Sequence, residues 1–149
     1  MVSYLTAKPS RDGVMVERQQ LTREWWGDRR QDFRVVSSQL VVQEASKGDM
    51  QAARRRLDIL REVELLAITP DATTLARSLT GSGIVPENSP EDALHVAVAV
   101  VNGCNYLVTW NYHHLAREDT RARIETFCRD EGYEPALICT PEELLEDEI

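Results

Sequence analysis

The chain has 149 residues, 42% of them hydrophobic, which is enough apolar surface for the core of one compact domain. It carries 17 Lys and Arg against 25 Asp and Glu, and its formal net charge is -8. This charge excludes tight nucleic-acid binding by phosphate neutralisation alone. An acidic protein can still meet a polyanion where divalent cations lie between carboxylates and phosphate, because the cation reverses the local field.

The first half of the chain alternates helical and strand patterns. The elements expected there are an extended start at Met1–Leu5, a long amphipathic helix after Gly13, a strand at Phe33–Ser37, a helix capped by Ser38, a helix over Met50–Arg61 and a strand at Leu65–Thr69. The last of these is a short, continuous apolar run, typical of a parallel strand buried on both faces. A break at Lys47-Gly48-Asp49 separates the two helices that precede it.

The second half continues the alternation. The elements expected there are a helix over Pro70–Leu79, a loop over Gly81–Asn88, a helix over Pro90–Val101, a strand at Tyr106–Trp110, a helix over Thr120–Glu131, a strand at Ala136–Thr140 and a short helix from Pro141. The pattern predicts one α/β domain over residues 1–149 with a mostly parallel sheet. Ligands of such sheets bind beyond the carboxyl ends of the strands.

Cysteine usage and hydropathy bear on the compartment. Cys104, Cys128 and Cys139 are odd in number and far apart, so neither a disulfide framework nor a zinc site is indicated, and reduced thiols are expected. The longest apolar run, near Val96–Val101, is too short to cross a bilayer, and no export signal is recognisable. We therefore expect a cytoplasmic protein without a membrane anchor.

Three oxygen-bearing side chains are candidates for chemistry. Glu44, Asp92 and Asn111 lie just past expected strand ends or near helix termini, in separate segments. Mg²⁺ and similar hard cations prefer a few carboxylate oxygens plus waters, which leaves positions open for phosphate oxygens. Each residue also has a simpler interpretation: Asp92 as part of an ordinary helix start, Asn111 as a turn former, and Glu44 as a solvated residue.

The positions of the histidines favour structural or substrate-contacting roles over zinc binding. His95 shares a helix face with Asp92, whereas His113 and His114 follow Asn111 in an expected loop. None has a cysteine partner or the His-x-x-x-His spacing of a helical zinc site. We expect structural or substrate-contacting roles, with His95 and His113 as the candidates for substrate contact.

Read together, three segments resemble successive motifs of the PIN-domain family. The segments are Gln43-Glu44-Ala45-Ser46, Asp92-Ala93-Leu94-His95-Val96-Ala97 and Tyr106-Leu107-Val108-Thr109-Trp110-Asn111. The resemblance extends from Ser3 to Glu142. It implies a three-layer α/β/α, Rossmann-like domain with a mostly parallel central sheet, in which RNA is cleaved with Mg²⁺ or Mn²⁺. Glu44 and Asp92 would hold the metal, and Asn111 falls where many relatives carry the last Asp of the cluster.

Among PIN domains the chain is most similar to the VapC-like toxins, ribonucleases that a cognate VapB-like antitoxin keeps silent and that are commonly dimeric. It departs from them at the N-terminus, where relatives have an apolar strand ending in an acid. Met1–Thr6 matches only the residues after that strand, so the single domain over 1–149 lacks the usual first strand and first acidic residue. An upstream start codon, a substitute segment and a decayed gene are the alternative explanations.

The resemblance leads to two hypotheses of function. The first is a metal-dependent endoribonuclease of a type II toxin–antitoxin system, with Glu44, Asp92 and Asn111 as catalytic and metal-binding residues. The second is a catalytically impaired PIN-like protein that acts by binding antitoxin or RNA, motivated by the missing acid and by Asn111.

Overall fold

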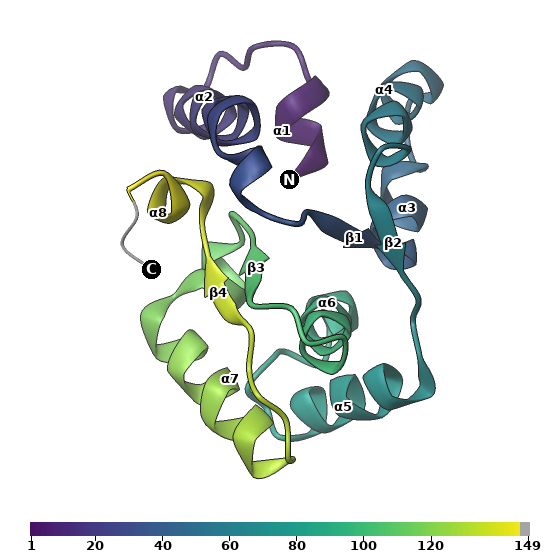
Figure 1. Cartoon of the computed structure of the whole chain (residues 1–149), viewed down its shortest axis with the longest axis vertical. Helices are drawn as coiled ribbons and strands as arrows, with labels where there is room; N and C mark the ends of the chain where they lie inside the picture. Colours follow the sequence, from purple (N-terminus) through teal and green to yellow (C-terminus); the bar gives the residue numbers. More distant parts are fainter. Residues whose placement is uncertain (147–149) are drawn as a thin grey trace. The chain divides into compact units, whose positions relative to one another are not determined.

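The computed structural model describes residues 1–146, apart from the side chains of Tyr112 and His113, and shows a mixed α/β chain (Figure 1). The chain divides into two compact units. Unit 1 comprises Met1–Leu66 and the C-terminal segment from Pro141, and unit 2 comprises Ala67–Thr140. No helix within residues 1–146 is long and apolar enough to cross a membrane.

Unit 1 contains several helices and one parallel strand pair. Its elements are α1 (Val2–Thr6), α2 (Gly13–Asp28), the 3-10 turn η1 (Arg30–Asp32), β1 (Val36–Ser38), α3 (Gln39–Ala45), α4 (Met50–Leu60), β2 (Glu64–Leu66) and α8 (Pro141–Leu145). Strands β1 and β2 pair with Ser37 opposite Leu65. The Ser38 hydroxyl accepts the Val41 N–H at 3.3 Å and caps α3, as its position before an apolar helix predicts.

Two side chains of unit 1 have structural roles that their sequence context leaves open. Trp25 is 5% exposed and packs against Trp26 and Phe33, with ring centroids 6.2 and 6.0 Å away. Arg56 donates to the carbonyls of Ala45 (3.1 Å) and Lys47 (2.7 Å). This arginine thereby ties α4 to the end of α3.

The expected extended start is wrong, because residues Val2–Thr6 form helix α1. Val2, Tyr4 and Thr6 are strand formers, and a five-residue helix is marginal by itself. Here α1 packs against α2 and α4, and the Tyr4 hydroxyl donates to the Met15 sulfur at 3.6 Å. Tertiary contacts therefore override the local preference of this segment.

The expectation of a strand buried on both faces at Leu65–Thr69 is also wrong. Strand β2 ends at Leu66, Glu64 and Leu65 are exposed, and the Leu65 side chain is 43% exposed. Among residues 1–146, β1 is the one strand that pairs with β2, so β2 is an edge strand of this two-stranded sheet.

Unit 2 alternates helices with a second parallel pair. Its elements are α5 (Pro70–Gly81), α6 (Pro90–Val101), β3 (Tyr106–Val108), the π-helical turn η2 (Tyr112–Ala116), α7 (Glu118–Asp130) and β4 (Leu137–Cys139). Strands β3 and β4 pair with Leu107 opposite Ile138. Helix α5 packs against α6, and α7 lies against β4 (Figure 1).

The core of unit 2 lies mainly between α5 and α6. Leu79, Ala93 and Ala97 are 0% exposed, and Val96 is 1% exposed. Gly103 follows the end of α6 with φ of 72°, a left-handed conformation in which glycine carries no steric penalty. The small side chains of Ala93 and Ala97 on α6 allow α5 to pack closely against this helix.

The predicted alternation and the parallel pairing are observed, with shorter strands than expected. The strands do not form one sheet among the described residues; they form two separate two-stranded sheets, one in each unit. That the whole of 1–149 acts as one domain stays a prediction.

Candidate functional site

Asp92 lies in the first turn of α6, which starts at Pro90. Acidic residues are favoured there because they offset the positive end of the helix dipole. Ser89 occupies the N-cap position without a side-chain cap hydrogen bond. The Asp92 carboxylate, 18% exposed, instead makes contacts outside its own helix.

Asn111 follows β3 and begins the π-helical turn η2. Its backbone carbonyl accepts the N–H groups of Leu115 (3.0 Å) and Ala116 (2.8 Å), and its side-chain oxygen accepts the His114 N–H at 3.0 Å. The single side chain thus caps a turn of a rare helix type, one that recurs at functional sites.

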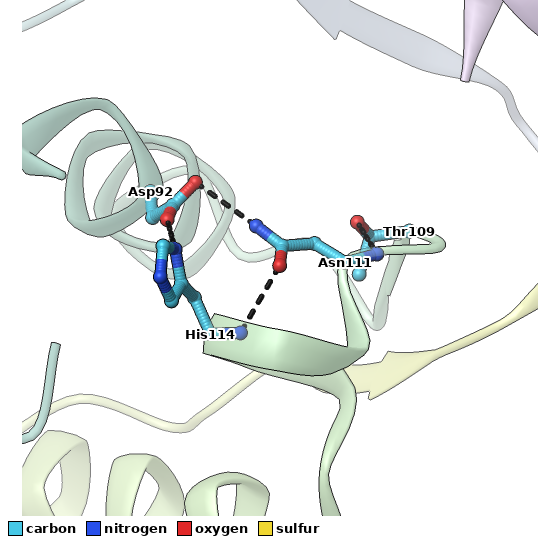
Figure 2. A network of polar contacts seen from close by, with 4 residues as sticks. All are labelled: Asp92, Thr109, Asn111 and His114. Carbon is cyan, nitrogen blue, oxygen red and sulfur yellow. Dashed lines mark hydrogen bonds and ion pairs between the residues drawn. The ribbon is translucent and has the colours of Figure 1, made fainter.

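Asp92, Asn111 and His114 form a closed polar group, called here the Asp92 cluster (Figure 2). The Asn111 amide nitrogen donates to Oδ1 of Asp92 at 3.1 Å, and Nδ1 of His114 lies 2.5 Å from Oδ2. Because Asn111 also caps His114, each residue of the cluster contacts the other two. Two of the three candidate ligands, Asp92 and Asn111, are therefore in contact.

Thr109, the residue that follows β3, links the cluster to the sheet. The Asn111 N–H donates to the Thr109 hydroxyl at 3.0 Å (Figure 2), and the Thr109 N–H donates to the Cys139 carbonyl at 2.8 Å. The end of β3, its partner β4 and the cluster are consequently linked by hydrogen bonds. Sites held on regular elements in this way are more precise than sites on unsupported loops.

The contacts of Asn111 fix the direction of its amide. Its oxygen faces a backbone N–H and its nitrogen faces a carboxylate. A flipped amide would bring two acceptors together and two donors together, so the assigned orientation is the favourable one. In this arrangement Asn111 presents an N–H to Asp92, and its carbonyl oxygen is engaged elsewhere.

The remaining candidate ligand, Glu44, belongs to unit 1. It is an exposed residue near the end of α3. Burial lowers the pKa of the Met1 α-amino group from its usual 8.0, and the charge of Glu44 acts in the opposite direction. The prediction that Glu44 joins Asp92 in one site stays a prediction.

Of the histidines, His114 is the one in the cluster, which the sequence interpretation missed. His95 lies partly buried on α6, one turn after Asp92, and its predicted substrate contact stays a prediction. The His113 side chain lies outside the described part of the structure. The spacing of Asn111 and His114 could have identified His114. When an Asn side chain caps the backbone N–H of the third residue after it, the side chain of that third residue is brought near the Asn side chain.

The donor set of the cluster suits an oxygen-seeking cation only after rearrangement. A carboxylate and an amide oxygen are ligands that Mg²⁺ and Mn²⁺ accept. Both oxygens of Asp92, however, already face nitrogen donors. Within residues 1–146, no three or more His, Cys, Asp or Glu side chains are grouped so that they could hold a metal. A cation at Asp92 must therefore displace at least one hydrogen bond.

Comparisons of the chain with protein-family models, with curated proteins and with solved structures gave no match.

Proposed function

We propose that the chain is a metal-dependent endoribonuclease of the PIN/VapC toxin type, which hydrolyses RNA phosphodiester bonds at a Mg²⁺ or Mn²⁺ site. The observation that carries the proposal is the 3.1 Å contact between Asp92 and Asn111. These residues come from two of the three segments that resemble PIN motifs, and they meet although 19 positions separate them in the chain. If Asp92 served only to stabilise the start of α6, its contact with Asn111 would not be needed.

In the proposed site Asp92 and Glu44 hold the cation, Asn111 orients a water or serves as a weaker ligand, and His95 contacts RNA. When bound, the cation supplies an activated water and offsets phosphate charge. This assignment also reconciles the substrate with the protein's charge: at -8 the chain cannot attract RNA by its net field. Acidic side chains that bind cations create a local positive charge, and this charge can bind the phosphate groups of RNA.

The three-layer α/β/α arrangement with a central sheet is part of the proposal. Its support is the parallel pairing of β1 with β2 and of β3 with β4. The cytoplasmic location, the homodimer and the VapB-like antitoxin belong to the proposal on the strength of the resemblance alone.

One observation favours a second candidate, a catalytically impaired PIN-like protein that binds antitoxin or RNA. Both Asp92 oxygens are satisfied by protein nitrogen atoms, and the cluster is complete without a cation. A carboxylate paired in this way loses those hydrogen bonds when it takes a metal ligand's role. The impaired protein would keep the fold and its partners without turnover.

The test is cleavage of a mixed-sequence RNA by the full chain with Mn²⁺ or Mg²⁺. Asp92→Asn is the matched variant, because its amide keeps the size of the side chain and one acceptor oxygen. We expect cleavage that EDTA abolishes and that falls by at least about a hundredfold in Asp92→Asn. Absence of cleavage by the folded chain with either metal would reject the nuclease and leave the second candidate.

A further inference from the structure

We propose that the exposed face of helix α4 in unit 1 binds the phosphate backbone of single-stranded RNA, with Arg54 and Arg55 as the contacting residues. The choice of RNA as the ligand rests on the proposed function. The contact itself needs no cation, so it applies equally to a PIN-like protein that binds RNA without cleaving it.

The segment around α4 has the opposite charge from the chain as a whole. Residues 47–61 contain five Lys and Arg against two Asp, a net charge of +3, whereas the whole chain carries -8. An acidic protein repels a polyanion at long range, and a local group of cations allows the two to associate. The α4 segment is therefore a surface at which RNA can approach unit 1.

The arginines of α4 and of its C-terminal end are not equivalent. Arg56 already donates to two backbone carbonyls, and Arg61 pairs with Asp58 at 3.2 Å. Arg54 and Arg55 are exposed, and within the described part of the chain neither forms a hydrogen bond or an ion pair. Their guanidinium groups therefore keep their N–H donors for a ligand.

The helix that carries the two arginines is held in place by other residues. Asp49 caps its first turn by accepting the Ala52 N–H at 2.9 Å, and Ala53 and Leu60 on its inner side are 6% and 4% exposed. A ligand that binds the exposed face therefore does not have to order the helix first, which lowers the cost of binding.

The side chains of this face favour RNA over a protein partner. The exposed residues of α4 are Met50, Gln51, Arg54, Arg55 and Asp58, and among these five Met50 alone is apolar. Protein interfaces place apolar side chains at their centre and exclude charge from it, whereas nucleic-acid interfaces are polar and positively charged. A guanidinium group also matches two oxygen atoms of one phosphate.

Two double variants separate the α4 face from net charge. Arg54→Gln/Arg55→Gln removes both contacts and keeps side chains of similar helix propensity, so α4 should still form. Arg77→Gln/Arg123→Gln is the matched control, because it removes the same charge from two exposed arginines of unit 2. Thermal unfolding of both variants verifies that each is folded.

The experiment is binding of a fluorescein-labelled single-stranded oligoribonucleotide to the full chain, followed by fluorescence anisotropy in EDTA at several salt concentrations. We expect Arg54→Gln/Arg55→Gln to bind at least about tenfold more weakly than wild type at low salt. Its slope of log K against log salt should be smaller by about 1.4, since a single strand contributes about 0.7 for each phosphate contact. The unit 2 control should stay within about twofold of wild type.

Four outcomes would overturn the α4 contact. They are equal affinity in wild type and Arg54→Gln/Arg55→Gln, equal weakening of both double variants, no RNA binding by wild type at low salt, and binding of labelled oligoglutamate in place of RNA. The last outcome would assign the face to an acidic protein segment.

The proposed nuclease is judged by a different measurement, cleavage with Mn²⁺ or Mg²⁺. Asp92→Asn should bind RNA in EDTA as wild type does, because Asp92 lies outside α4. Cleavage by wild type together with unchanged RNA affinity in Arg54→Gln/Arg55→Gln would reject the α4 contact and leave the nuclease standing. RNA binding through α4 without cleavage would reject the nuclease and leave the contact standing.

Discussion

Unit 1 and unit 2 differ in how completely their cores are buried. In unit 2, Leu79 and Ala93 are 0% exposed, and the helices α5 and α6 that carry them pack against each other. In unit 1 the buried leucines retain some exposure, with Leu40 at 7% and Leu60 at 4%, although Thr22 is 0% exposed. The Asp92 cluster therefore rests on a close-packed scaffold, whereas Glu44 lies on a short helix of the less completely buried unit.

Asp92 and Glu44, two candidate ligands of one proposed site, therefore lie in structural surroundings that differ in packing. A group held by a dense core keeps its geometry, because neighbouring side chains leave no room for alternatives. A group on a seven-residue helix depends on its cap and on a few contacts. Three predictions test this contrast.

The largest effect is expected from truncation of the unit 2 core. Leu79→Ala removes a fully buried side chain between packed helices and should cost about 2–5 kcal/mol of the free energy of unfolding. Leu40→Ala in unit 1 should cost less, because its surroundings are partly open and can collapse. Urea unfolding, with hydrogen exchange read separately for α3 and α6, gives both values. A loss at Leu40 equal to that at Leu79 would contradict the contrast.

An intermediate effect is expected from Asn111→Asp. One carboxylate oxygen can cap the His114 N–H while the other faces a cation, which the Asn111 amide cannot do without losing its cap. We expect Mg²⁺ affinity to rise on the order of tenfold. Without metal, repulsion between the new carboxylate and Asp92 should lower Tm.

Calorimetric titration with Mg²⁺ measures the affinity of Asn111→Asp, and thermal unfolding with and without Mg²⁺ measures the repulsion. Asn111→Ser is the matched control, since it shortens the side chain without adding charge. An unchanged affinity in Asn111→Asp would show that the cluster is not the cation site.

The smallest effect is expected from Cys128 in unit 2. Burial, with a smaller contribution from Glu131, raises the pKa of this thiol from 9.0 to about 11. The unfolded chain therefore loses the proton first, so the contribution to stability is complete below pH 9 and is lost as pH rises from 9 to about 11. Between pH 8 and 10 the loss should be on the order of 1 kcal/mol.

The difference in unfolding free energy between wild type and Cys128→Ala, followed over this pH range, isolates the thiol from other titrating groups. Thiol labelling gives a second measure: the partly exposed Cys104 should react well before Cys128, which is 0% exposed. Equal labelling rates would indicate that unit 2 opens more readily than its packing implies.

The sequence predicted local events well. Ser38 caps α3 as expected, Asp49 caps α4 after the break at Lys47-Gly48-Asp49, and α6 begins at Pro90 and ends at Val101, as predicted. Each event depends on contacts within about four residues, which is why a sequence pattern specifies them.

The candidate site was predictable in part. Glu44, Asp92 and Asn111 were candidates because ligands of parallel α/β sheets bind beyond the carboxyl ends of the strands, and two of them, Asp92 and Asn111, are in contact. His114 was not predicted, since its contact with Asp92 depends on the π-helical form of the Tyr112–Ala116 turn. A change of one residue in the length of a helical turn points its side chains in another direction. Sequence patterns predict the ends of turns with an uncertainty of at least one residue, so they do not specify this direction.

Local sequence patterns therefore specified the starts of α3, α4 and α6, the alternation of strands with helices, and the residue types available to a site. Tertiary structure alone decided that Val2–Thr6 is helical, that the strands form two pairs, and that Asp92 contacts His114. The two groups of features differ in the separation along the chain of the residues that interact. Helix caps and turns depend on residues a few positions away, whereas strand pairing and polar clusters depend on contacts between segments far apart in the chain.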